Sequence, residues 1–461
     1  MRSKAICLSI FISALIFLTW NPGRSSSSAR EAAPPKTPTW AKTIKNSNGG
    51  VRMRQGMPDS EGGCLVVGDN GYWSNLDGWA AHVDKDGQIL NQMNYSGKKH
   101  DRLYSLCASG DKGYIAAGWT QFDISGINES GGYGLLMKLD AGLKPAWAKS
   151  YTALKYTNFI PAVIKLKTKG YLAVMESWGD SDSGLVIMSL DSSGCVVWSR
   201  ILKTDLAYYF PEISEIIQAP DGGFLLIGTL FIRGNSRKDG VIIKIDGKGN
   251  LKWAKTYGQA ESYEEFYSAF LTANGDLMVF GCHYPDFTAS HALVLKIDQN
   301  GRIKWQTLYK KLGYNGFRFG LAGSGGGFYA VGDCDGTSSV QINSVRGDAT
   351  GKILSKKGYA AFYGPYPNYY ETVSDAFWSS DGGIIVLERI LWSYTDGYVA
   401  KMDANGILPK ACQMMSVNIS RSKANFKPTD MIFPYETIAV TEKPATIKAT
   451  ATSCTASEAC D

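Results

Sequence analysis

Residues 221–257 read DGGFLLIGTLFIRGNSRKDGVIIKIDGKGNLKWAKTY. A glycine pair opens one apolar run, a second apolar run ends in Asp246, and Gly249 separates it from a third run that carries Trp253. An Asp side chain caps a tight turn, and a Gly accepts the positive φ that closes a short hairpin. The segment therefore predicts one strand followed by a hairpin of two more.

The glycine-led phrase recurs along the chain, and successive copies start between 50 and 57 residues apart. A second phrase follows each copy: an apolar run that ends in Asp, then a Gly and a further strand that usually contains Trp. In the sixth unit, at 340–359, this phrase has no Trp, and we assign no turn-capping Asp to it. The seven copies are GGCLVVG (62–68), KGYIAAG (112–118), KGYLAVM (169–175), GGFLLIG (222–228), GDLMVFG (275–281), GGFYAVG (326–332) and GGIIVLE (382–388).

A further strand precedes each glycine-led phrase, as in EISEIIQA (212–219) and FYSAFLTA (266–273). Each unit of about 50 residues then holds four strands, which we call A to D. Seven such units predict an all-β fold, a seven-bladed β-propeller of four-stranded antiparallel blades over residues 38–414. Two β-sandwiches would explain the strands but not a single period that runs from Arg52 to Met414.

The ends of the repeat indicate how the ring closes. TWAKTIK (39–45) is a spare copy of strand D that stands before any strand A. In the last unit, ILPKACQ (407–413) has Lys410 where Trp is usual and contains Pro409, which removes a ladder donor and suits only a sheet edge. We therefore predict that the Trp40 strand completes or flanks the seventh blade and closes the ring.

The repeats resemble those of secreted bacterial β-propellers of the delta-60 or PQQ-like type. The resemblance rests on the DGG-apolar phrase (221–228 and 381–387) and on Lys-x-Asp-x-x-Gly-x-x-x-Trp (244–253 and 296–305). It covers about residues 38–414 and implies a fold more than a function. In that family the Trp packs flat between blades, which implies a structural role for Trp40, Trp147, Trp198, Trp253 and Trp305.

The N-terminus predicts export. Arg2 and Lys4 precede an apolar run of 16 residues, Ala5 to Trp20, which is short for a spanning helix and is followed by small polar residues. We predict a signal peptide over residues 1–29 with a linker at 30–37; an uncleaved N-terminal anchor is the alternative. The expected location is secreted, periplasmic or cell-surface, and no second segment of the sequence is apolar enough to span a membrane.

The net charge and the cysteine content limit the classes of partner and the disulfides that we expect. Removal of residues 1–29 deletes Arg2, Lys4 and Arg24 and no acid, so the net charge falls from +6 to +3. Without a basic block, nucleic acid is not an expected partner. Eight of the nine cysteines lie beyond the signal, and we predict a local disulfide between Cys454 and Cys460 in the Ser/Thr/Lys-rich tail, 415–461. That tail forms either a pair of edge strands or a segment along the disc.

No complete catalytic motif is present in the sequence: it has no G-x-S-x-G, no H-E-x-x-H and no Walker A. We predict no cofactor. The acidic loops GDSDSG (179–184) and GDCDG (332–336) leave Ca²⁺ as an alternative, because Asp180, Asp182, Asp333 and Asp335 offer oxygen ligands. His283 and His291 are more simply read as strand-end imidazoles than as metal ligands.

The A–B and C–D turns are short, whereas the B–C and D–A loops, which share the opposite face, are longer and rich in aromatics. Aromatic side chains at the rim of a site stack on sugar rings or pack against peptide side chains. We predict an exported binding module for an extracellular glycan or protein on this long-loop face, through Trp73, Trp119, Trp178, Tyr284, Trp392 and Tyr394.

An enzyme at the mouth of the central channel is the alternative, either a glycan lyase or hydrolase or, less favoured because the chain has no Cys-Cys pair, a quinoprotein-like enzyme. Clustered acids with shifted pKa values at the channel would favour the enzyme, and an aromatic face with scattered charges would favour the binder.

Overall fold

The computed structural model describes most of the chain beyond residue 36. The predicted signal peptide and most of the linker lie outside the described residues. The described ranges are 37–45, 50–72, 75–97, 99–122, 132–179, 183–203, 211–232, 237–259, 261–286, 289–310, 316–333, 340–360, 371–390, 397–409, 414–415, 420–424, 426–430, 435–437, 441–444, 448–451 and 455–458. Within them, no helix is long and apolar enough to cross a membrane.

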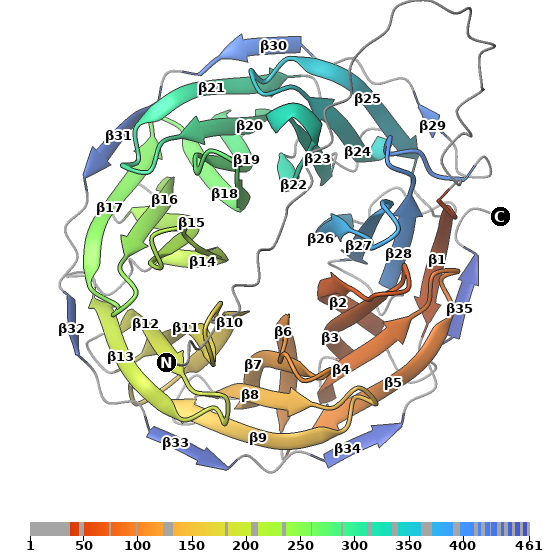
Figure 1. Ribbon diagram of the computed structural model, residues 1–461, viewed down its shortest axis with the longest axis vertical. Helices are drawn as coiled ribbons and strands as arrows, with labels where there is room; N and C mark the ends of the chain where they lie inside the picture. The colour runs from red at the N-terminus through yellow and green to blue at the C-terminus, as the bar shows by residue number, and fades with distance from the viewer. Residues whose placement is uncertain are drawn as a thin grey trace, which may run out of the picture. The chain divides into compact units, whose positions relative to one another are not determined.

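Seven antiparallel sheets form a ring, and the first strand of each sheet lies nearest its centre (Figure 1). Blade 1 comprises β2 (Gly50–Pro58), β3 (Cys64–Tyr72), β4 (Asn75–Val83) and β5 (Ile89–Ser96). Blade 2 comprises β6 (His100–Ala108), β7 (Tyr114–Phe122), β8 (Tyr133–Leu139) and β9 (Pro145–Thr152). Blade 3 comprises β10 (Asn158–Lys165), β11 (Tyr171–Trp178), β12 (Ser183–Leu190) and β13 (Val196–Lys203). Blade 4 comprises β14 (Pro211–Gln218), β15 (Phe224–Ile232), β16 (Arg237–Ile245) and β17 (Leu251–Gly258).

Blade 5 comprises β18 (Tyr263–Leu271), β19 (Leu277–Asp286), β20 (Ala289–Ile297) and β21 (Ile303–Lys310). Blade 6 comprises β22 (Phe317–Ala322), β23 (Phe328–Asp333), β24 (Val340–Gly347) and β25 (Ile353–Ala360), with a short 3₁₀ turn, η1 (Ser324–Gly326), between its first two strands. Blade 7 comprises β26 (Glu371–Trp378), β27 (Ile384–Ile390), β28 (Gly397–Met402) and β1 (Trp40–Lys45). The predicted seven-bladed propeller of four-stranded blades is confirmed.

The predicted ring closure is also confirmed. Strand β1 pairs antiparallel with β28, with Trp40 opposite Lys401 and Ile44 opposite Gly397. The first strand of the repeat region therefore supplies strand D of the last blade. This pairing ties the two ends of the repeat region through backbone hydrogen bonds.

Asp-capped turns join strands C and D in all seven blades. In blade 4, Oδ1 of Asp246 accepts hydrogen bonds from the backbone N–H groups of Lys248 and Asn250, at 2.9 and 2.8 Å. Blade 6 corrects one sequence assignment. Asp348 makes the same two bonds, to Thr350 and Lys352, so the sixth unit lacks only the Trp. In this unit Asp348 follows Arg346 and Gly347, so the Lys-x-Asp phrase that marks the turn in other units is absent.

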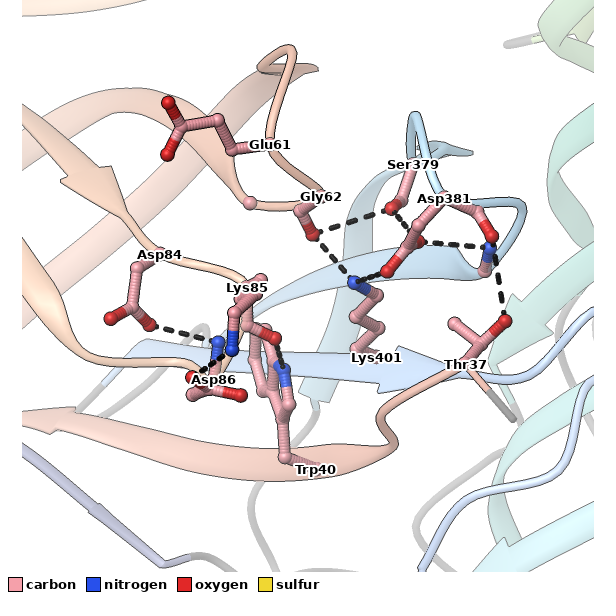
Figure 2. A network of polar contacts seen from close by, with 12 residues as sticks. Thr37, Trp40, Glu61, Gly62, Asp84, Lys85, Asp86, Ser379, Asp381 and Lys401 are labelled. Carbon is pink, nitrogen blue, oxygen red and sulfur yellow. Dashed lines mark hydrogen bonds and ion pairs between the residues drawn. The ribbon is translucent and has the colours of Figure 1, made fainter. Parts of the chain in front are cut away.

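The Lys of the Lys-x-Asp phrase, on strand C, pairs with an Asp of the A–B turn. Lys244 Nζ lies 2.7 Å from Asp221 and Lys401 Nζ lies 2.6 Å from Asp381, each an Asp of the A–B turn. Lys401 also donates to the carbonyl oxygen of Gly62, at 2.6 Å, and so reaches from blade 7 to blade 1 (Figure 2). These lysines are part of the scaffold.

Strand D of each blade docks on the C–D turn of the next blade. The indole N–H of Trp40 donates to the carbonyl of Lys85 at 2.6 Å, and that of Trp305 donates to the carbonyl of Ala349 at 3.1 Å. Tyrosines four residues further along strand D, or in its equivalent position, donate to turn carbonyls. These bonds run from Tyr95 to Leu143, Tyr151 to Gly194, Tyr257 to Gly301, Tyr309 to Gly351 and Tyr359 to Gly406.

The C-terminal tail adds an outer fifth strand to every blade, in the reverse of the chain order (Figure 1). We call these strands the belt. The belt visits blades 6, 5, 4, 3, 2, 1 and 7 as β29 (Met414–Met415), β30 (Ser420–Lys423), β31 (Lys427–Asp430), β32 (Tyr435–Thr437), β33 (Thr441–Pro444), β34 (Lys448–Ala451) and β35 (Thr455–Glu458). The last of them pairs with β1, the strand that closes the ring.

Between two belt strands the chain contributes to the apolar core. Ala424 and Phe426 lie between β30 and β31, are almost fully buried, and pack with residues of blades 4 and 5. The backbone of Phe426 also exchanges hydrogen bonds with the side-chain amide of Gln306, at 3.1 and 3.2 Å. An apolar pair recurs in the tail sequence about every seven residues, at Val417/Ile419, Ala424/Phe426, Met431/Phe433, Ile438/Val440 and Ala445/Ile447.

We predict that Phe426→Ala destabilises the protein by about 3 kcal/mol, because truncation of a buried Phe leaves a cavity. The midpoint of urea unfolding measures this effect. Lys443→Ala, at an exposed position of the belt, is the matched control and should leave the midpoint unchanged. Equal midpoints for both variants would show that the belt does not contribute to the folded core.

Candidate binding site in the central channel

A β-bulge interrupts the inner strand of every blade at the same height. In blade 1, Met53 pairs with Gly68 and Gln55 with Val67, so Arg54 is the extra residue. The closing Gly of the repeat permits this close approach: a Cβ on Gly68 would lie 1.9 Å from the carbonyl oxygen of Arg52. A bulge re-aims the side chain of its extra residue. Here the re-aimed residues line the channel, as Arg54, Tyr104, Pro161, Ser214, Tyr267, Arg318 and Ser374.

The channel encloses a cavity of about 600 Å³ that all seven inner strands line. Its volume lies within the range of about 300–1,000 Å³ that is typical of ligand pockets. Charged and aromatic side chains dominate the wall and divide into a basic part on blades 1 and 2 and an acidic part on blades 3, 4 and 7.

The basic part is organised around Asp69, a fully buried residue of β3. Arg54 lies 3.2 Å from its carboxylate and Arg102 lies 3.7 Å from it, and Arg52 forms a direct hydrogen bond to it. Burial alone would raise the pKa of Asp69, but the three guanidinium groups hold it below the usual value. Three cations around one anion leave a net positive charge at this side of the channel.

Aromatic rings lie against these arginines. The guanidinium of Arg54 lies 4.7 Å from the ring centre of Tyr104, and Arg102 donates to the Tyr104 hydroxyl at 3.3 Å. Phe159 of blade 3 meets the Tyr104 ring edge-on, with centroids 4.5 Å apart. The result is a half-buried aromatic and cationic surface on the channel wall.

The acidic part holds Glu176, Glu212, Glu215 and Asp375. Burial, and then the proximity of Glu212, raises the pKa of Glu176 to about 8. Burial, and then the proximity of Asp375, raises the pKa of Glu215 to about 8 as well. Asp375 accepts backbone hydrogen bonds from Gly56 and Ala376, both at 2.8 Å, yet burial raises its pKa to about 7. Carboxyl groups with such pKa values exchange protons near neutral pH.

In blades 4 to 6, charged and aromatic side chains form a further cluster at the channel, held by hydrogen bonds and a cation–π contact. Glu265 accepts hydrogen bonds from Lys238 and from the Tyr267 hydroxyl, and the guanidinium of Arg318 lies 4.1 Å from the ring centre of Tyr267. The Cys282 sulfur lies 3.0 Å from the same hydroxyl, but burial raises the pKa of this thiol to about 12. The thiol is therefore protonated at neutral pH and is not a nucleophile.

The structure brings two of the predicted aromatic residues to this region. Trp119 is buried in β7 with the guanidinium of Arg102 at 5.3 Å from its ring, and Tyr284 is half-buried in β19 near Cys282. Trp178, at the end of β11, is 38% exposed, and Tyr133, at the start of β8 on the same face, is 39% exposed. Trp73, Trp392 and Tyr394 lie outside the described residues.

The described residues give few candidate metal ligands. His283 Nδ1 lies 2.6 Å from the Glu264 carboxylate, and the ring of His291 is centred 6.0 Å from that of His283. No group of three or more His, Cys, Asp or Glu that could hold a metal occurs in the described part. Asp180, Asp182 and Asp335 lie outside it, and Asp333 ends β23. A Ca²⁺ site in these acidic loops stays an alternative.

The predicted disulfide lies outside the described residues, which exclude Cys454 and Cys460. Cys64, Cys107, Cys195 and Cys282 are free thiols. The loop pattern also differs in detail from the expectation. The A–B connections hold five residues in every blade, whereas the B–C connections range from two residues (73–74) to ten (123–132), so the face is uneven.

The repeat pattern in the sequence did not reveal the channel residues. Their signal was the polar residues at the bulges, as in RMR (52–54), EISE (212–215) and EFY (265–267). A bulge places consecutive or alternate residues on one side of a strand, so the simple two-residue alternation does not reveal which of them face the channel.

No protein-family model and no curated protein matches the chain. Solved structures resemble it weakly. Sqt1 of Chaetomium thermophilum is 9% identical with a TM-score of 0.42 over 81% of this chain and 98% of that one. A protein of unknown function from Dyadobacter fermentans is 10% identical with a TM-score of 0.41 over 80% and 100%. Another from Bacteroides caccae is 12% identical with a TM-score of 0.37 over 69% and 93%. Likenesses at this level indicate no function, and the delta-60 or PQQ-like type stays a prediction.

We predict that stability falls between about pH 4 and pH 8 because of Glu176 and Glu215. Their folded pKa of about 8 exceeds the unfolded value of about 4.3, so the unfolded chain releases these protons first as the pH rises. The double variant Glu176→Gln/Glu215→Gln should lose less stability from pH 5 to pH 8, by about 3 kcal/mol per carboxylate.

Urea unfolding at the two pH values measures the difference. Glu61→Gln, at an exposed carboxylate on the short-turn face, should keep the pH dependence of the unmodified protein. A double variant with that same pH dependence would contradict the raised pKa values.

Proposed function

We propose that the protein is an exported binding module that holds a segment of a peptide or protein at the channel, approached from the long-loop face. The main support is the charge arrangement in one cavity of about 600 Å³. A net positive part around Asp69 and Tyr104 lies beside an acidic part around Glu176 and Glu212 in this cavity. A peptide carries charges of both signs and aromatic side chains, and therefore matches this wall better than a neutral glycan does.

The aromatic residues of the channel add to this proposal. Tyr104 and Phe159 are half-buried and line the cavity, so each offers a face or an edge to an incoming side chain. Cation–π contacts already hold Tyr104 and Tyr267 in place. Side chains whose rotamers are held by neighbours lose little entropy when a ligand binds.

A second candidate function rests on the clustered carboxyl groups. The raised pKa of Glu176, caused by burial and by Glu212, is a feature of general acids, and glycan hydrolases use paired carboxyl groups. This observation favours a glycan hydrolase or lyase at the channel as the alternative. Assays of purified protein on polysaccharides test it: activity that Glu176→Gln abolishes would favour the enzyme over the binder.

We predict that a peptide array probed with purified protein selects peptides that carry basic and aromatic residues. Glu212→Gln should weaken the selected binding about tenfold, because it removes negative charge from the acidic wall. Glu61→Gln removes the same charge on the opposite face and should bind as the unmodified protein does. A blank peptide array, or a glycan array with hits that Glu212→Gln weakens, would overturn the peptide assignment.

Export is the second part of the proposal and is supported by the apolar run from Ala5 to Trp20 after Arg2 and Lys4. We predict that the protein produced in a bacterial host is recovered outside the cytoplasm with a mass that corresponds to cleavage near Ala29. Mass spectrometry of the intact protein measures it. A cytoplasmic protein that retains Met1 would contradict export, and a membrane fraction that retains residues 1–29 would indicate the anchor.

A further inference from the structure

A second pocket lies on the short-turn face, between blades 4 and 5. Its volume is about 260 Å³, and residues of both blades line it, among them Trp253 of β17 and Gln299 and Asn300 of the C–D turn of blade 5. This volume is just below the range of about 300–1,000 Å³ for pockets that bury drug-sized ligands. The pocket therefore suits a ligand of about one six-membered ring with its substituents.

Trp253 is docked differently from the other tryptophans of the repeat. At Gly87, Gly194, Gly249 and Gly351, the Trp of the preceding blade is among the atoms that a Cβ would meet, at 2.4–3.1 Å. At Gly301, the equivalent glycine for Trp253, the three nearest atoms belong to Lys255 and Tyr257. Among the described residues the indole N–H of Trp253, like those of Trp147 and Trp198, has no acceptor, whereas Trp40 and Trp305 each have a turn carbonyl, so the position of the ring and not this bond sets Trp253 apart.

The contacts across the blade boundary beside Trp40 differ from those beside Trp253. There Lys401 donates across the blade boundary to the carbonyl of Gly62 at 2.6 Å, and Ser379 donates to the same carbonyl at 3.3 Å (Figure 2). The equivalent Lys244 contacts only Asp221 of its own blade, at 2.7 Å, among the described residues. The groove beside Trp253 thus lacks the bridge that closes the groove beside Trp40.

The walls of the open groove are amphipathic. Trp253 is half-buried, and Leu225, Leu277 and Ile297 form an apolar floor. The rim is polar: Asp221, Gln299 and Asn300 are exposed, and each has side-chain oxygen or nitrogen atoms that can bond a ligand. Asp221 is held in place by Lys244 and by the backbone N–H of Gly223 at 2.9 Å.

We propose that this pocket binds one pyranose ring of a carbohydrate. A pyranose has an apolar C–H face, which suits the indole of Trp253, and hydroxyl groups at its edge that both donate and accept hydrogen bonds. The carboxylate of Asp221 accepts from such hydroxyls, and the amides of Gln299 and Asn300 donate and accept. An aliphatic ligand would displace water from this polar rim without replacing its hydrogen bonds, which costs binding energy. The site is separate from the channel and does not depend on the proposed peptide binding.

The test uses saturation-transfer NMR of the purified protein with the methyl glycosides of glucose, galactose, mannose and N-acetylglucosamine. We expect at least one glycoside to bind, and we expect Asn300→Ala and Gln299→Ala, at exposed positions, to weaken its binding at least fivefold. Trp253→Leu should abolish binding and the accompanying change in tryptophan fluorescence. Trp198→Leu, which removes a docked Trp on the neighbouring blade, should leave binding unchanged and controls for loss of stability.

The proposal is overturned if none of the four glycosides shows saturation transfer, or if Asn300→Ala, Gln299→Ala and Trp253→Leu all bind within twofold of the unmodified protein. Glu212→Gln, in the channel, should bind the glycoside normally. A loss of glycoside binding in that variant would place the carbohydrate in the channel and would also overturn the present site.

Discussion

The Asp-capped turn between strands C and D is the interaction on which the ring depends. One carboxylate oxygen holds two backbone N–H groups, and this fixes a turn whose fourth residue has a positive φ. The carbonyl of that residue then points to the preceding blade, where a buried tyrosine donates to it in five of the seven boundaries. A local turn thereby sets the distance and angle between blades. In blade 2 the position is Leu143, with a φ of 66°, so the geometry persists without glycine.

The channel follows from a second local feature, the bulge in each inner strand. Because all seven bulges lie at one height, their extra residues converge on the axis, where no apolar core exists to bury them. Their side chains vary from blade to blade, while the residues between the blades are uniformly apolar. The apolar residues between the blades thus recur from blade to blade, whereas the residues of the channel wall differ. A basic part and a carboxyl-rich part in one cavity form an arrangement that a symmetric repeat could not produce, and this arrangement supports the proposal of a peptide ligand.

The belt covers the outer edge of every sheet. Strand D of each blade would otherwise present unpaired N–H and C=O groups around the whole ring, a hazard for edge-to-edge association. The belt pairs with all seven of these strands and ends on β1, so the ring is closed once by β1 and once more by the belt. Because the belt runs around the circumference, the described part of the tail leaves the channel and the groove beside Trp253 open.

The sequence by itself determined the strands, their number per unit and the turn chemistry, because each depends on residues of one short unit and recurs seven times. It also determined the closing role of the Trp40 strand, because a spare copy of strand D stands before the first unit. It also indicated the Trp docking positions, but not that Trp253 lines an open groove, since that depends on Lys255 and on a cross-blade contact that Lys244 does not make. Only the tertiary structure placed Arg54, Tyr104 and Glu176 around one cavity, because they come from different blades and a bulge aims two of them. Only the tertiary structure showed the belt, whose strands of two to four residues are too short to carry a β pattern and are held by the edges that they pair with.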